Sequence, residues 1–167
     1  MTNKLPDAEI LLQSLASSLK PLINKDTALV GIHSGGAWLM QRLLPSLGAD
    51  LAHGILDVSF YRDDFNQRGL HSETKPSQIP FEVEGRHIIL IDDVFYTGRT
   101  IRAAMNELFD YGRPASITLA VLVNRGGREL PIAPQISAFE ITLQASQNLQ
   151  LLRHEDGIFY LSLKENA

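Results

Sequence analysis

The sequence predicts a doubly wound, mainly parallel α/β sheet with a small β-rich cap. Short apolar runs, each the length of a buried strand, alternate with amphipathic helical segments between residues 28 and 123. Near the C-terminus, two further apolar segments flank Asp156-Gly157, a dipeptide typical of hairpin turns. The chain has 167 residues, 44% of them hydrophobic. This length and composition suit a single domain over 1–167 with a full core.

The N-terminal half predicts a helix followed by a strand–helix–strand unit. Asp7 is placed to cap a first helix, in which apolar residues recur at mostly helical spacing at Ile10, Leu11, Leu15, Leu19 and Leu22. A strand is then predicted over 28–33, a helix over 36–47 and a second strand over 51–61.

Residues 62–86 contain Gly69, Pro76 and Pro80 and have little apolar periodicity. Loops of this length inside compact domains are usually lids or disordered segments. We therefore expect a mobile active-site loop here, with a merely solvated loop as the alternative.

The second half continues the alternation. A buried strand begins at Ile88, a helix over 99–111 stops at Gly112 with Pro114 beyond it, and a further buried strand covers 116–123. The segment 136–143 alternates like a strand, and 149–153 pairs with 158–163 across the Asp156-Gly157 turn. We expect these last strands, within 124–167, to form the cap and a C-terminal hairpin.

The most informative motif follows the strand at Ile88–Ile91. Asp92 and Asp93 stand where this strand ends, which is where ligands bind in open α/β sheets. From Thr97 to Thr100, a glycine and two hydroxyl residues allow backbone N–H groups and a helix start to converge on one anion. The carboxylates would repel a phosphate, but they accept hydrogen bonds from adjacent sugar hydroxyls. The motif therefore predicts a site for ribose 5-phosphate.

Other interpretations of these residues fit less well. A nucleotide-triphosphate P-loop needs a glycine five residues before its second glycine, and Asp93 occupies that place. A serine-hydrolase elbow around Ser34 would need glycine at Ile32. An acidic pair alone also occurs in phosphoacceptor domains or as a solvated strand end, so the prediction depends on the complete string.

This string resembles the signature of the type I phosphoribosyltransferases, which bind 5-phosphoribosyl 1-diphosphate (PRPP). Further segments look like the PyrR family, which combines uracil phosphoribosyltransferase activity with, in some members, RNA-dependent control of pyrimidine genes. The resemblance covers about residues 8 to 135. Its segments are 57–64, 94–100, 111–117 and 120–132.

The resemblance implies roles for individual residues. Tyr96, Thr97, Gly98, Arg99 and Thr100 would bind the 5-phosphate, and His33, Ser34, Gly35 and Gly36 would form a diphosphate loop. Val123, Asn124 and Arg125 would face the base, with Arg125 near diphosphate or base. Asp92, Asp93 and Arg62 would be catalytic; Arg68 and Lys75 would join Arg62 at the departing diphosphate. Mg²⁺ would contact Asp92 and Asp93 directly or through water.

The chain also departs from the family pattern. Ser34-Gly35-Gly36 stands where Thr-Arg-Gly is common, and Asn124 and Gly127 replace the usual Asp and His. Tyr96 stands where purine members place an aspartate that meets the purine ring, which favours a pyrimidine. The expected reaction converts uracil and PRPP to UMP and diphosphate.

The alternative function is a UMP- or PRPP-responsive RNA-binding regulator with weak or no catalysis, and a third is a sensor without turnover. The net charge of −4 and the absence of a basic arm do not favour RNA, although folding can gather Lys20, Lys25, Arg42, Arg128 and Arg153. The resemblance implies a homodimer or larger homo-oligomer. The five histidines have no metal-ligand spacing and there is no cysteine, which excludes disulfides. The N-terminus resembles neither a signal peptide nor a membrane span, so we expect a cytoplasmic protein without a membrane partner.

Overall fold

The computed structural model describes residues 4–59 and 77–166. Its centre is a five-stranded parallel sheet of order β2-β1-β3-β4-β5. The strands are β1 (Thr27–Ile32), β2 (Ala52–Leu56), β3 (His87–Phe95), β4 (Ser116–Asn124) and β5 (Ile136–Glu140). The fold class predicted from the sequence is therefore confirmed.

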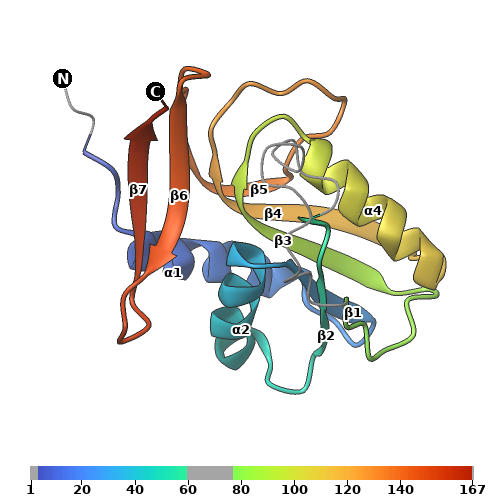
Figure 1. Cartoon of the computed structure of the whole chain (residues 1–167). Helices are drawn as coiled ribbons and strands as arrows, with labels where there is room; N and C mark the ends of the chain where they lie inside the picture. Colours follow the sequence, from blue (N-terminus) through green and yellow to red (C-terminus); the bar gives the residue numbers. More distant parts are fainter. Residues whose placement is uncertain (1–3, 60–76, 167) are drawn as a thin grey trace.

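Helices cover both faces of this sheet (Figure 1). On one face, α1 (Ala8–Leu19) and α2 (Gly35–Leu47) pack against alternate strand residues such as Leu29 and Ile89. On the other face, α4 (Arg99–Tyr111) packs against the intervening residues, among them Val30 and Leu90. Because both sides of the strands are buried, their sequences read as continuous apolar runs.

The first helix differs in detail from its prediction. Asp7 is its N-cap and accepts a hydrogen bond from the Glu9 N–H at 2.8 Å, as expected. The α-helix ends at Leu19, and a 3₁₀ turn (Lys20–Leu22) containing Pro21 follows, because proline cannot continue the helical hydrogen bonds. Ile10 is 63% exposed and Leu22 43% exposed, so their predicted place in the apolar stripe is wrong. The buried face instead comprises Ala8, Leu11, Leu12, Leu15 and Leu19.

Two strand predictions also need correction. The second strand ends at Leu56, well before the predicted Tyr61. The segment that begins at Ile136 does not belong to the cap: β5 pairs in parallel with β4, with Ala120 beside Ile136, and forms the edge of the main sheet. Alternation of apolar residues indicates a strand but does not identify the strand beside it. The hairpin turn at Asp156-Gly157 favoured a place in the cap, whereas the segment pairs with β4.

The predicted C-terminal hairpin is confirmed. It consists of β6 (Gln147–Arg153) and β7 (Phe159–Glu165), which form a separate antiparallel sheet beside α1 (Figure 1). Glu9 in α1 anchors it: its carboxylate accepts the Phe159 N–H at 2.8 Å and pairs with Arg42 of α2 at 2.7 Å. In the part of the chain that the structure describes, no helix is long and apolar enough to cross a bilayer.

Candidate active site

The predicted anion-binding residues meet at one edge of the sheet. The strands β1 and β3 are adjacent and parallel, so the loops that follow them leave side by side. From β1 the chain proceeds outward to β2 and then returns to β3 on the other side, which makes this gap the topological switch point of the sheet. Open α/β sheets bind their ligands in that crevice.

The loop predicted to bind diphosphate, residues 33–36 and named the diphosphate loop for that prediction, connects β1 to α2. Its His33–Ser34 peptide is cis, and α2 begins at Gly35. A Cβ on Gly36 would overlap the carbonyl oxygen of Ile91 and lie 3.1 Å from the Cα of Asp92. Glycine is therefore required for the start of α2 to lie directly against the end of β3.

The two acids lie beneath this loop. Asp92 is only 4% exposed, and its Oδ1 accepts the N–H of Asp93 at 2.9 Å. The half-buried carboxylate of Asp93 lies against Gly35, where an added Cβ would come within 2.6 Å of the Asp93 Cγ. Here Gly35 replaces the family's arginine, and its missing side chain leaves room for Asp93.

The loop predicted to bind the 5-phosphate, residues 96–100 and named the phosphate loop for that prediction, connects β3 to α4. Gly98 has φ +97°, the left-handed conformation that favours glycine, and it is the N-cap of α4. At a helix start the first N–H groups have no intrahelical acceptor. The hydroxyl of Thr97 accepts the Arg99 N–H at 3.2 Å, and an anion at this helix start would meet the other N–H groups of its first turn.

Two contacts hold this loop in place from outside. The carbonyl of Thr97 accepts the Glu129 N–H at 2.9 Å, and the guanidinium of Arg99 pairs with the Glu129 carboxylate at 3.0 Å. The Arg99 side chain is thus directed toward Glu129. An anion at the start of α4 would therefore meet backbone groups.

The end of β4 supplies the predicted base side. Val123 is buried, and the side-chain oxygen of Asn124 accepts the Gly126 N–H at 3.2 Å. A pocket of about 220 Å³ opens beside these residues and is lined by Asn124, Gly126, Glu140, Ile141 and Thr142. The last three residues were not predicted. The parallel pairing of β5 with β4 brings these three residues beside Asn124, and the sequence pattern did not indicate that pairing.

Arg125 is placed differently from the prediction that it meets diphosphate or base. Its side chain is buried, and its two terminal nitrogens donate to the carbonyls of Gln147 at 2.8 Å and Gln144 at 3.0 Å. The guanidinium also lies over the ring of Tyr96, 3.9 Å from the ring centroid. Both terminal nitrogens are therefore used within the protein.

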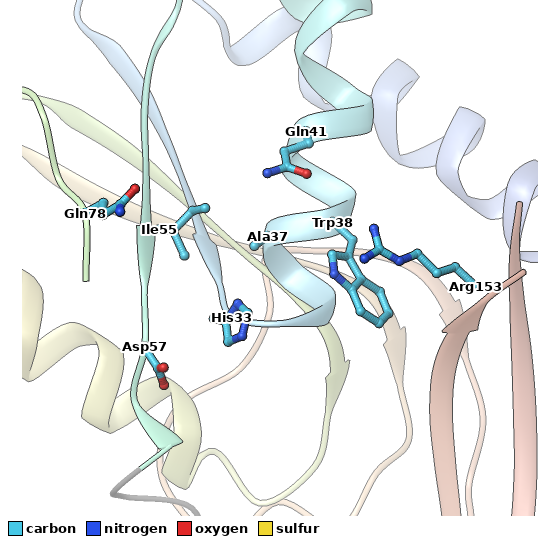
Figure 2. Close-up of a pocket in the computed structure, with 8 residues that line it drawn as sticks. All are labelled: His33, Ala37, Trp38, Gln41, Ile55, Asp57, Gln78 and Arg153. Atoms are coloured by element: carbon cyan, nitrogen blue, oxygen red, sulfur yellow. The ribbon is translucent and has the colours of Figure 1, made fainter. Parts of the chain in front are cut away.

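A second cleft, of about 320 Å³, borders the diphosphate loop (Figure 2). His33 forms one end, with Asp57 after β2, and Trp38 and Gln41 project from α2. Arg153 of β6 lies over the Trp38 ring at 4.3 Å. The remaining predicted residues, Arg62, Arg68 and Lys75, lie outside the described residues, as does most of the predicted mobile loop.

Together the fold and this edge define a phosphoribosyltransferase domain. The family model for the phosphoribosyl transferase domain matches residues 3–152. Among solved structures, a Staphylococcus aureus hypoxanthine phosphoribosyltransferase has a TM-score of 0.62 at 20% identity, covering 83% of this chain and 75% of that one. A purine phosphoribosyltransferase from Pyrococcus horikoshii has a TM-score of 0.59 at 23% identity, covering 80% and 82%. At these identities the likeness concerns the fold.

Within that class, the chain belongs to the PyrR family. It is 48% identical over 151 residues to the bifunctional protein PyrR of Pseudomonas fluorescens, covering 88% of this chain and 90% of the relative. It is 50% identical over 161 residues to the bifunctional protein PyrR of Ralstonia nicotianae, covering 94% and 92%. The family resemblance noted in the sequence is thereby confirmed.

Proposed function

We propose that the protein is a uracil phosphoribosyltransferase that converts uracil and PRPP to UMP and diphosphate. The observation that carries this proposal is the convergence of residues 33–36, residues 96–100 and two acids at the switch point between β1 and β3. PRPP has the matching groups: a diphosphate, two ribose hydroxyls and a 5-phosphate.

The reaction breaks the bond between ribose C1 and a diphosphate oxygen and forms a bond from C1 to uracil N1, which gives up its proton. Positive charge develops on the ribose in the transition state. The carboxylates of Asp92 and Asp93 hold the ribose hydroxyls and stabilise this charge, while the N–H groups of the phosphate loop fix the other end of the sugar. Positioning and charge stabilisation thus account for the catalysis.

The acids also suit a magnesium ion shared with the substrate. Mg²⁺ binds oxygen, keeps several waters and is often held by one or two carboxylates together with substrate phosphates. No cluster of three or more metal-binding side chains occurs in residues 4–59 and 77–166. When bound, Mg²⁺ neutralises charge on the leaving diphosphate, and Asp92 and Asp93 would hold it directly or through water.

Uracil fits the base side better than a purine does. The ring of Tyr96 is enclosed between the Arg125 guanidinium and the backbone of Gly127, where an added Cβ would come within 2.5 Å of the ring. Tyr96 stands where purine members have an aspartate that meets the purine ring, which favours a pyrimidine. The adjoining pocket of about 220 Å³ is small.

The test is diphosphate release from PRPP and Mg²⁺ with uracil, hypoxanthine, guanine, adenine and orotate supplied separately. We expect turnover with uracil, lost in the double variant Asp92→Asn/Asp93→Asn and retained in Asp110→Asn, an exposed acid near the far end of α4. Turnover with a purine instead, or turnover that survives in the double variant, would contradict the proposal.

RNA binding is the second candidate. The observation that favours it is a row in which two cations flank two rings: Arg153 lies over Trp38, Trp38 stacks on the buried Phe159 at 6.4 Å, and Arg42 lies over Phe159 at 5.0 Å. This row brings two of the five dispersed cations onto one surface. Filter binding of single-stranded RNA tests it: we expect affinity to fall with salt, and to fall further in Arg153→Ala. Equal RNA affinity of the wild type and Arg153→Ala would exclude this surface as the RNA-binding site.

A further inference from the structure

Arg125 joins three segments that are separate in the sequence. Its guanidinium lies on the Tyr96 ring in the phosphate loop, and it donates to the Gln144 and Gln147 carbonyls just before and at the start of β6. Arg125 itself follows β4. With 4% of its surface exposed, this cation is stabilised by carbonyl dipoles and an aromatic face, and no carboxylate pairs with it in the described part of the chain.

The backbone around Arg125 follows the same connections. Its N–H donates to the Phe95 carbonyl at 3.1 Å, and its own carbonyl accepts the Leu143 N–H at 3.3 Å. Asn124 likewise accepts the Ile141 N–H at 3.0 Å. The end of β4 therefore lies between the phosphate loop and the segment 141–147, and the Arg125 side chain contacts both of these neighbours.

The small pocket lies between the segments so joined. One wall comes from Asn124 and Gly126 and the other from residues 140–142, which lead directly to Gln144. The two hydrogen bonds from Arg125 to Gln144 and Gln147 are side-chain contacts between these two walls, and they would be lost without Arg125. The phosphate loop, in contrast, keeps its bonds to Glu129 and its place at the start of α4.

We propose that Arg125 is a positioning residue that holds the two walls of the base pocket in place beside the phosphate loop and touches neither diphosphate nor base. This inference rests on the proposed function, because it assigns the pocket to the base. The proposal predicts different effects on the binding of UMP and of PRPP. UMP needs both the base pocket and the phosphate loop, whereas PRPP needs the phosphate and diphosphate loops and carries no base.

The test is calorimetric binding of UMP and of PRPP to the full chain as wild type, Arg125→Met and Arg125→Lys. The matched control is Arg86→Met, which removes another arginine that lies over a ring, that of Phe81 at 6.0 Å, near the opposite end of the sheet. We expect Arg125→Met to weaken UMP binding by about 10- to 100-fold, the cost of misplacing binding groups by about 1 Å. PRPP binding should change by less than about twofold, Arg125→Lys should recover part of the loss, and Arg86→Met should bind both ligands normally.

Other outcomes overturn the inference. If PRPP binding weakens as much as UMP binding, Arg125 contacts diphosphate or supports the whole site, and if neither changes, it positions nothing. A lower melting temperature with unchanged UMP binding assigns Arg125 to stability alone. If Arg125→Met does not fold, Arg125→Lys decides by the same comparison. Wild-type turnover of uracil is measured alongside: its absence refutes the proposed function, while UMP binding still tests the role of Arg125.

Discussion

Gly36→Ala tests whether the start of α2 must lie directly against β3. The added Cβ would overlap the Ile91 carbonyl oxygen and stand 3.1 Å from both the Ile91 carbonyl carbon and the Asp92 Cα. All three are backbone atoms of a central strand, so no side-chain rotation relieves the overlap. Unstrained non-bonded carbon atoms lie about 3.5–4.0 Å apart, so α2 and the diphosphate loop must move by about 0.5–1 Å.

Two effects should follow from this movement. Overpacking of this kind costs about 1–3 kcal/mol of the free energy of unfolding. Displacement of the diphosphate loop from Asp92 and Asp93 should also lower kcat/KM for PRPP by up to about 100-fold. Urea unfolding measures the first effect, and steady-state diphosphate release at saturating uracil measures the second.

Gly54→Ala is the matched control. Its Cβ would lie 2.6 Å from the Gln78 carbonyl oxygen, at the outer side of edge strand β2, away from both loops. It should lose a similar amount of stability and keep kcat/KM within about threefold of wild type, as expected of a change that displaces no group in the site. If Gly36→Ala retained wild-type kcat/KM, or if Gly54→Ala lost as much activity, the reasoning from loop placement would be refuted.

Three further predictions follow from the described contacts. Asp92→Asn or Asp93→Asn alone should reduce kcat/KM by about 10- to 100-fold, the effect of a lost charged hydrogen bond, with little change in the melting temperature; steady-state kinetics with thermal unfolding would contradict this if activity persisted. Arg99→Ala should change kcat/KM less than about threefold and stability by less than about 1 kcal/mol, since its guanidinium forms an exposed ion pair with Glu129 and backbone groups form the anion site; a large rise in KM for PRPP would instead show that Arg99 holds the phosphate. The hydrogen bond from Arg42 holds the pKa of Glu9 below its ordinary value of 4.5, so the unfolded chain binds the proton more tightly and the Glu9 contribution is present above pH 4.5 and lost as pH falls through the lowered pKa. Melting temperatures of wild type and Glu9→Gln should therefore differ at pH 7, and this difference should shrink as the pH falls below 4.5. A difference that stays the same across this pH range would count against this ion pair.

The sequence placed the predicted site segments correctly in the fold wherever the relevant contacts are local. Asp92, Asp93 and residues 96–100 fall within one strand–turn–helix unit, so their mutual placement depends on few dihedral angles and the motif predicts it. Residues 33–36 lie between β1 and α2 as expected, because their glycines and the end of β1 are adjacent in the chain. The ligand groups assigned to both loops stay predictions. The expected positive φ of Gly98 is confirmed at +97°.

The errors concern pairings between distant residues. Whether residues 136–140 extend the main sheet or join a cap depends on which strand they meet, and both solutions satisfy the same alternation. Arg125 presents the same difficulty. Its sequence position indicates a cation near the ligand, but its actual acceptors, Gln144 and Gln147, are carbonyls about twenty residues later that no side-chain pattern marks. Roles for Arg62 and the rest of residues 60–76 stay predictions.

The strand order has a consequence for how the protein tells one base from another. The proposed ligand lies across the sheet in the order of the strands: diphosphate after β1, ribose and 5-phosphate after β3, and base after β4 and β5. In that arrangement the reacting bond would lie over the centre of the sheet, while the base, the part of the ligand that varies between related enzymes, would lie toward an edge. Substitutions near the ends of β4 and β5 can therefore change the accepted base without changing β1 and β3. One fold can thus acquire new substrates through changes at the edge of its sheet.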